Sequence, residues 1–180
     1  SHENIEFYIG SSVWADKDFK GHFYPPKTAQ KNFLVEYAKQ FKSVEVNATR
    51  YGTPKASTLE TWKNNVPDDF KFSFKMPQII SVRKNLLEKD VLSRLEEFIL
   101  AMDSMGKKAG TTFILLQNSF GKERLSELEG FLKELPQEQE FAVEIRNPLF
   151  NQSLELGELL HQYNVANVRF LSRAKTLYRL

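Results

Sequence analysis

Two glutamates stand near the ends of strand-like segments. Glu45 lies in "KSVEVNATRY" (residues 42–51) and Glu144 lies in "FAVEIR" (residues 141–146). A carboxylate costs free energy to bury, so a glutamate inside an apolar segment points to a site. Two carboxylates in a partly desolvated cleft can divide into a general acid and a general base. We therefore predict that Glu45 and Glu144 are catalytic. The alternative is that both belong to ion pairs that fill the interior.

Two cationic residues occupy similar positions. Lys75 ends the segment "FKFSFK" (70–75), and Arg146 follows Glu144 by two residues. A buried lysine can act as a nucleophile, so we predict a catalytic role for Lys75, with anion binding as an alternative. The guanidinium of Arg146 can form two parallel hydrogen bonds to a carboxylate or a phosphate, which predicts substrate binding. For both residues the other interpretation is a counter-ion of the neighbouring glutamate.

Two amides and two aromatic residues complete the predicted site. The side chains of Asn47 and Gln117 can each donate and accept hydrogen bonds, which suits the recognition of hydroxyl groups. Capping of loop backbone is their alternative role. Trp14 and Tyr51 lie in loops near the polar residues and could stack on a sugar or a base. We predict substrate contacts for all four.

Metal and cofactor chemistry have little support in the sequence. His22 and His161 are isolated, and there are no cysteines. The chain has 8 glycines and no glycine motif that would cradle a phosphate. We therefore expect no bound metal and no cofactor. A Mg²⁺ ion held by Glu45 and Glu144 is the alternative.

The elements that must position these residues alternate along the chain. Apolar spacing predicts strands at 7–10, 43–47, 70–75, 111–117, 141–146 and 165–171. Helices are predicted at 32–41, 57–66, 88–106, 122–135 and 154–163. Ser57 and Glu60 could form a capping box, and Gly106 suits the end of its helix. This alternation indicates βαβ units and a parallel sheet.

The strands also alternate between polar and apolar residues. One face would carry apolar side chains such as Val44, Val46, Phe72 and Phe74. The opposite face would carry Ser43, Glu45 and Asn47, then Lys71, Ser73 and Lys75, then Ala142, Glu144 and Arg146. A sheet covered by helices on both faces should be apolar on both. The pattern therefore favours an α/β fold of the (β/α) TIM-barrel type, with its site at the carboxyl ends of the strands.

Several segments together resemble the DUF72 (YecE-like) family. They are "YIGSSVWADKDFKGHFYP", "LVEYAKQFKSVEVNATRYGTP", "TWKNNVPDDFKFSFKMPQIIS", "FILLQ" and "FAVEIRNPLF", and they cover residues 8 to 150. The resemblance implies a TIM-barrel fold of undetermined biochemical role. The sequence departs from the family's usual residues at Ser81–Val82, Asn118–Ser119, Asn147 and Arg169.

The number of strands is small for a closed barrel. We expect one domain over residues 1–180 because no linker or change in composition divides the chain. About six strands are predicted, whereas a closed (β/α)8 barrel needs roughly 200 residues or more. Six strands left open would also expose unpaired edges. We therefore expect that C-terminal strands of the native protein are missing from this sequence. A shortened chain and a smaller sheet are the alternatives.

The composition limits the partners. The chain has 25 basic and 23 acidic residues, a formal net charge of +2, and this balance disfavours a nucleic-acid surface. Apolar runs such as "FILL" (113–116) are too short to cross a membrane. No leader opens the sequence, so the expected location is the cytoplasm. The expected partner is a small molecule or an anionic ligand, and the oligomeric state is left open.

These residues lead to three functional hypotheses. The first is a hydrolase or lyase that acts on a small polyhydroxylated or phosphorylated molecule. The second is a non-catalytic protein that binds a metabolite or a nucleic acid with the same residues. The third is a metal-dependent phosphoesterase, which the scarcity of histidine ligands disfavours. The sequence leaves open whether the protein is an enzyme.

Overall fold

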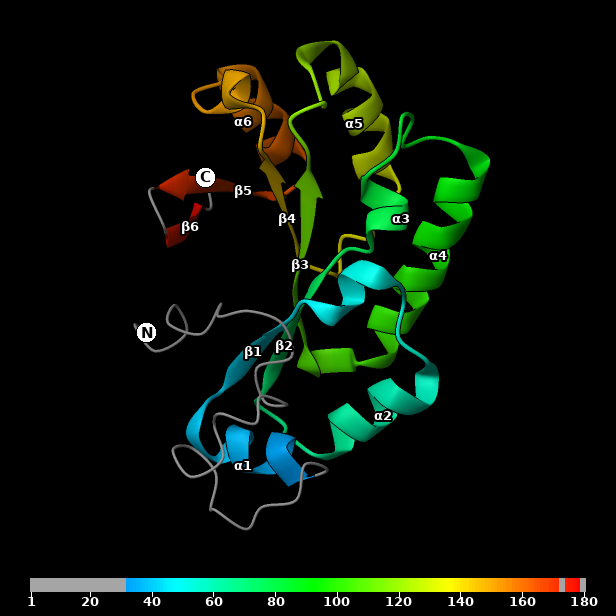
Figure 1. Cartoon of the computed structure of the whole chain (residues 1–180), viewed down its shortest axis with the longest axis vertical. Coiled ribbons are helices and arrows are strands. Elements are labelled where there is room, and N and C mark those ends of the chain that lie inside the picture. Colours follow the sequence, from blue (N-terminus) through cyan, green and yellow to red (C-terminus); the bar gives the residue numbers. More distant parts are fainter. Residues whose placement is uncertain (1–31, 172–173, 179–180) are drawn as a thin grey trace.

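The computed structural model describes residues 32–171 and 174–178 (Figure 1). The predicted strand at 7–10 and the predicted ligand contact Trp14 lie outside the described residues. The helices are α1 Phe33–Gln40, α2 Ala56–Asn64, α3 Gln78–Ser81, α4 Lys89–Ser104, α5 Leu125–Lys133 and α6 Leu154–Gln162. The strands are β1 Ser43–Val46, β2 Lys71–Lys75, β3 Ala109–Leu116, β4 Phe141–Ile145, β5 Ala166–Leu171 and β6 Ala174–Tyr178. Short 3₁₀ turns lie at Ala48–Tyr51, Gly106–Lys108, Lys122–Arg124 and Pro148–Phe150.

The strands form one sheet in the order of the chain, β1-β2-β3-β4-β5-β6. The pairs from β1 to β5 are parallel, and β6 returns antiparallel to β5. The predicted parallel sheet of βαβ units is therefore confirmed for five strands. The prediction lacked β6, because the short segment "AKTLY" follows β5 without a helix between them. The described strands do not close into a barrel.

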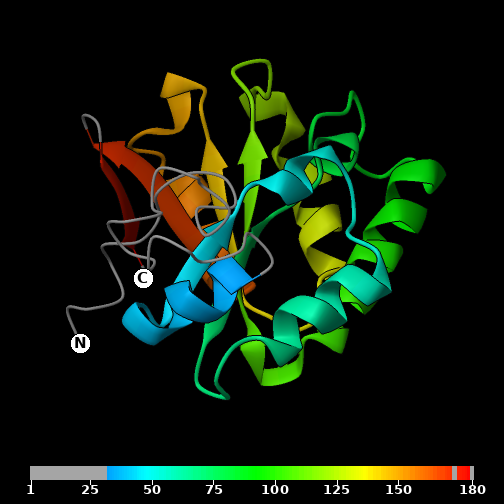
Figure 2. The same cartoon turned by 60° about the horizontal axis from the view of Figure 1, so that its bottom comes forward.

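All six helices pack on one face of this sheet. Figure 2 shows α2, α4 and α5 together on that side. Every helix contributes buried residues to a single apolar cluster, which also takes alternate residues of β1 to β4. Phe72 lies at the centre of this cluster, with ring centroids 5.1 Å from Phe70, 6.1 Å from Phe74 and 6.3 Å from Trp62. These aromatic contacts hold the helix layer against the strands.

The opposite face carries a small apolar cluster made of strand residues alone. Ala142, Ala166 and Val168 form it, with Phe113 packed against it. The strand register places Glu45 opposite Ser73, and it places Glu144 opposite Leu115. The predicted alternation of the strands between two kinds of face is therefore confirmed. We call this surface of β1 to β5 the helix-free face.

Two details of helix α2 and helix α4 test the predicted helix ends. The predicted capping box of Ser57 and Glu60 is wrong, because α2 begins at Ala56 and Lys55 is its N-cap, without a side-chain hydrogen bond. Ser57 therefore lies inside the first turn, where its carbonyl accepts a bond from the Thr61 hydroxyl. Gly106 follows the C-cap of α4 with φ of 56°, the left-handed conformation that favours glycine.

Candidate functional site

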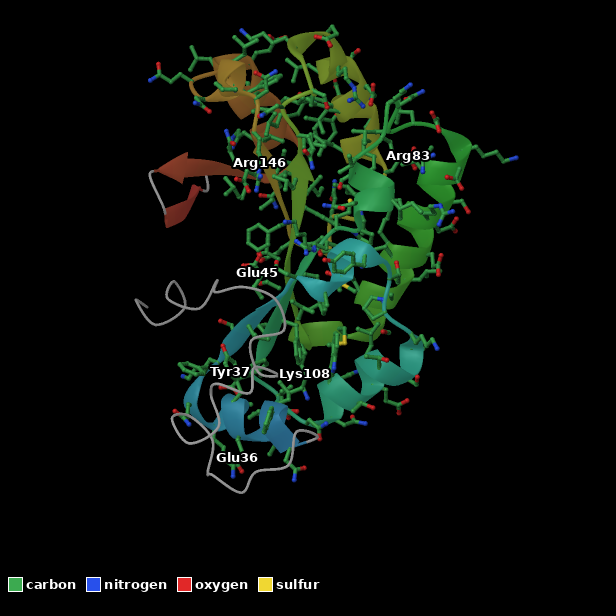
Figure 3. The ribbon with its side chains drawn as sticks, viewed as in Figure 1. Glu36, Tyr37, Glu45, Arg83, Lys108 and Arg146 are labelled. Atoms are coloured by element: carbon green, nitrogen blue, oxygen red, sulfur yellow. The ribbon has the colours of Figure 1, made fainter. Side chains whose placement is uncertain are left out.

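Glu45 and Glu144 both lie on the helix-free face, one residue before the end of their strands. Their exposed fractions are only 6% and 7%. Figure 3 shows Glu45 at the end of β1. Strands β2 and β3 separate the two glutamates, so three steps of about 4.8 Å place them roughly 14 Å apart along the sheet. The structure thus puts them on one face but not in adjacent strands.

Thr49 joins the ends of β1 and β2. Its hydroxyl accepts a hydrogen bond from the backbone N–H of Lys75 at 3.1 Å. The same hydroxyl lies 2.6 Å from the carbonyl of Lys75 and 3.0 Å from that of Val46, so it can donate to either. Thr49 thereby fixes where Lys75 leaves the sheet. The sequence analysis missed this positioning residue, although a hydroxyl residue directly after a buried strand is a usable signal.

Asn47 and Tyr51 border the 3₁₀ turn that follows β1. The carbonyl of Asn47 accepts the N–H of Arg50 at 3.0 Å, and its side chain makes no capping bond to the turn. Tyr51 is 75% exposed, and the Arg50 guanidinium lies 4.5 Å from the centre of its ring while hydrogen bonding to its hydroxyl. The tyrosine therefore stands on the surface beside a cation, and its predicted contact with substrate is a proposal.

Glu144 and Arg146 line one cavity at the carboxyl end of β4. Its volume is about 410 Å³, and its lining also includes Asn118, Ile145, Phe150, Asn151, Leu156, Asn167 and Val168. The backbone N–H of Arg146 donates to Leu116 at 2.8 Å and so extends the pairing of β3 with β4. Asn147 fixes the following turn, since its amide donates to the Phe120 carbonyl and accepts from Leu149 N–H, both at 3.1 Å. The cavity wall is therefore anchored on both sides of Arg146.

Asn167 is a cavity residue that the sequence analysis did not single out. It lies on β5 with only 5% of its surface exposed, and it lines the cavity of Glu144 and Arg146. The signal was present in "VANVRFL" (165–171), where an amide interrupts an otherwise apolar strand start. A buried amide normally has a hydrogen-bond partner. Its register partner on β4 is Val143, a residue of the helix-side cluster, so Asn167 borders the cavity from the helix side while Glu144 lies on the helix-free face.

Gln117 lines a different cavity of about 320 Å³, beyond the end of β3. The structure therefore does not bring Gln117 together with Glu144 and Arg146 in one cavity. Arg124 borders the same space and donates to the Arg83 carbonyl at 2.7 Å and to Glu127 at 2.6 Å. Figure 3 shows Arg83 at this end of the molecule, on the loop after α3.

Glu127 ties that loop to helix α5. It accepts the backbone N–H of Leu86 at 2.8 Å in addition to the bonds from Arg124. Burial opposes ionisation, but the Arg124 bond, the Leu86 bond and the charge of Arg124 together hold the pKa of Glu127 below its ordinary value. Glu127 is therefore a structural carboxylate, and its charge strengthens the bonds from Arg124 and Leu86 that fix the loop to helix α5.

Another cavity, of about 830 Å³, lies at the amino ends of the strands. Its lining mixes lysines with carboxylates and includes Lys42, Asp69, Lys71, Lys107 and Glu140. We place the candidate site at the other end, because ligands of parallel sheets bind beyond the carboxyl ends of the strands.

Across the described part of the chain, no group of three histidine or carboxylate residues could hold a metal ion. Nor does this part contain a helix long and apolar enough to span a bilayer.

Comparison with known proteins connects the chain to one family. A family profile described as "Protein of unknown function DUF72" matches residues 8–177. The UPF0759 protein YecE of Escherichia coli (strain K12) is 37% identical over 174 residues, which cover 92% of this chain and 59% of the relative. The UPF0759 protein YunF of Bacillus subtilis (strain 168) is 38% identical over 71 residues, 39% of this chain and 24% of the relative. The chain thus spans about three fifths of the length of the E. coli relative.

Solved structures show the same fold. A DUF72 family protein of Thermotoga maritima matches with a TM-score of 0.66 and 24% identity, covering 89% of this chain and 63% of the other. A DUF72 family protein of Enterococcus faecalis V583 matches with a TM-score of 0.64 and 21% identity, covering 78% and 59%. At this identity the two structures support the fold alone.

Proposed function

The chain belongs to the DUF72 family, and from that premise we propose that it is an acid–base enzyme of the hydrolase or lyase type. Its substrate is a small polyhydroxylated or phosphorylated molecule bound at the carboxyl ends of the strands. One observation carries the proposal: Glu45 and Glu144 are both more than nine-tenths buried on the helix-free face, near the ends of parallel strands. Carboxylates are rarely buried so deeply without a specific role or partner.

The roles follow from the chemistry of each residue. Glu45 and Glu144 provide the general acid and the general base, a contribution of about 10²–10⁴-fold in rate for a well-placed group. Lys75 and Arg146 would hold the negative charge of the substrate, and Asn47, Tyr51 and Gln117 remain proposed contacts. Trp14 is a further proposed contact that lies outside the described residues. The roughly 14 Å between the glutamates is a path along the sheet, and in the proposed barrel both side chains would point into one interior, which would bring their carboxylates closer together.

The proposal includes a (β/α) barrel of the TIM type for the whole protein, with residues 1–180 as part of that single domain. Three features support it: the strand order follows the chain, the parallel strands are consecutive, and all described helices lie on one face. The helix-free face would then be part of the barrel interior. The relatives are longer than this chain, which leaves room in them for further strands.

The test is a turnover screen with a matched set of variants. The protein is incubated with panels of glycosides, sugar acids and sugar phosphates, and products are detected by NMR. We expect turnover of at least one class, and a loss of about a hundredfold or more in Glu45→Gln and in Glu144→Gln. Glu97→Gln is the control, because Glu97 is an exposed residue on α4, on the helix side of the sheet.

Three outcomes would contradict the proposal. Equal turnover in the wild type and both variants would remove the glutamates from catalysis. Ligand binding without turnover in any panel would identify a non-catalytic binding protein instead, and a strict requirement for a divalent ion would indicate the phosphoesterase.

A further inference from the structure

The cavity at the ends of β4 and β5 is lined by both polar and apolar residues. The apolar ones are Leu156 of helix α6, Ile145, Phe150 and Val168. Its volume of about 410 Å³ falls within the range of roughly 300–1,000 Å³ that is typical of small-molecule sites. The cavity is therefore large enough for a ligand of metabolite size.

Asn167 lies on β5 with only 5% of the residue exposed, and it lines this cavity. A side-chain amide can both donate and accept hydrogen bonds. A molecule bound in the cavity could therefore exchange hydrogen bonds with Asn167.

The Arg146 guanidinium is a second polar group of this cavity. It is exposed at the cavity mouth and makes no ion pair with a described side chain. Asn118 and Asn151 add two exposed amides to the same rim, and Glu144 adds a buried carboxylate. Three amides and a carboxylate can bind several hydroxyl groups, while the guanidinium binds one anionic group.

We propose that this cavity binds a small polyhydroxylated anion, with Asn167 and the rim amides on its hydroxyl groups and Arg146 on its charged end. The inference rests on the proposed function and deepens it by naming the substrate class. A carboxylate and a phosphate present the same chemistry to Arg146, so both sugar acids and sugar phosphates belong to the class.

Calorimetric titration with three probes tests the inference. Gluconate carries a carboxylate, glucose 6-phosphate carries a phosphate, and sorbitol carries hydroxyl groups without charge. We expect at least one of the two anions to bind at least tenfold more tightly than sorbitol. Preference for one anion identifies its charged group as the one that the cavity recognises. Equal binding of sorbitol and both anions would overturn the role of Arg146, and binding of none of them would overturn the inference.

Variants locate the binding in this cavity. Arg146→Met should weaken anion binding at least tenfold, whereas Arg94→Met, an exposed arginine on α4, should not. Asn167→Asp keeps the shape but replaces the amide donor with a charge, and Asn167→Ser keeps a smaller polar group. Both should weaken binding at least tenfold while the melting temperature shows that each variant is folded. Wild-type affinity in folded Asn167 variants would overturn the inference.

The same titrations separate this inference from the proposed function. Binding that depends on Asn167 and Arg146, without turnover of any panel, would leave the inference standing and end the proposed function. Turnover that depends on Glu45 and Glu144, with full binding in the Asn167 variants, would support the proposed function and overturn the inference.

Discussion

The two faces of the sheet differ although the same strands build both. On the helix side, alternate residues such as Val46, Phe72 and Val143 join one large apolar cluster with all the helices. On the helix-free face, the residues between them include Glu45, Ser73 and Glu144, which are buried and polar. The apolar side contributes most of the folding free energy. Burying the polar side costs free energy unless its groups are hydrogen-bonded or paired.

The largest expected effect is a loss of core packing on the helix side. Phe72→Ala should lower the free energy of unfolding by about 3–5 kcal/mol, because Phe72 is fully buried among Phe70, Phe74 and Trp62. Urea denaturation followed by circular dichroism measures it. A loss below about 1 kcal/mol would mean that the helix side is not the stabilising one.

A second effect on the helix side depends on alkaline pH. Burial raises the pKa of Tyr37 to about 12, against an ordinary value of 10.0. The unfolded chain then releases this proton at lower pH than the folded one, so stability should be fully present below pH 10 and decline between pH 10 and 12. Melting temperatures across that range should fall less steeply in Tyr37→Phe. Identical slopes in both proteins would contradict the assignment.

A smaller effect concerns the loop clamped by Glu127. Glu127→Gln should cost about 1 kcal/mol at neutral pH, since the carboxylate loses its charge-assisted bonds to Arg124 and Leu86. Because the pKa of Glu127 is lowered by folding, the difference from wild type should be present above pH 4.5 and disappear as the pH falls further. Denaturant melts at pH 7 and pH 3 measure it. A difference that is as large at pH 3 would exclude a role for the charge.

The smallest effect on stability is expected on the helix-free face. Glu45→Gln and Glu144→Gln should each change the free energy of unfolding by less than about 1 kcal/mol, because Gln keeps the shape and one hydrogen-bonding oxygen of the side chain. Denaturant melts of both variants beside Phe72→Ala measure the contrast. A loss of unfolding free energy close to that of Phe72→Ala would show that the glutamates stabilise the fold. The two faces would then not differ in their contribution to stability.

The sequence predicted the layers better than the site. Strand alternation around Glu45 and Phe72 assigned both faces correctly, because a period of two leaves no freedom about which side a residue takes. The antiparallel β6 was missed, because the five predicted βαβ units contain only parallel strands and do not indicate that a further strand runs in the opposite direction. The capping box at Ser57 failed because a one-residue difference in where α2 begins changes which side chain can cap it.

The site depends on distances between strands, which spacing along the chain does not contain. The sequence placed Glu144 and Arg146 two residues apart, and the structure gives them one cavity. It could not show that Gln117 borders a separate cavity, because that depends on how the loop after α3 meets α5. Asn167 was overlooked because one amide in an apolar strand is informative only when the cavity that it lines is known.

The most direct test of where the site lies is an NMR map of amide shifts during titration with gluconate or glucose 6-phosphate. The account predicts that the shifted amides gather at the carboxyl ends of β1, β2, β4 and β5, around Glu45, Lys75, Glu144 and Asn167. Shifts gathered at the amino-end cavity, around Lys42, Lys71 and Lys107, would contradict it.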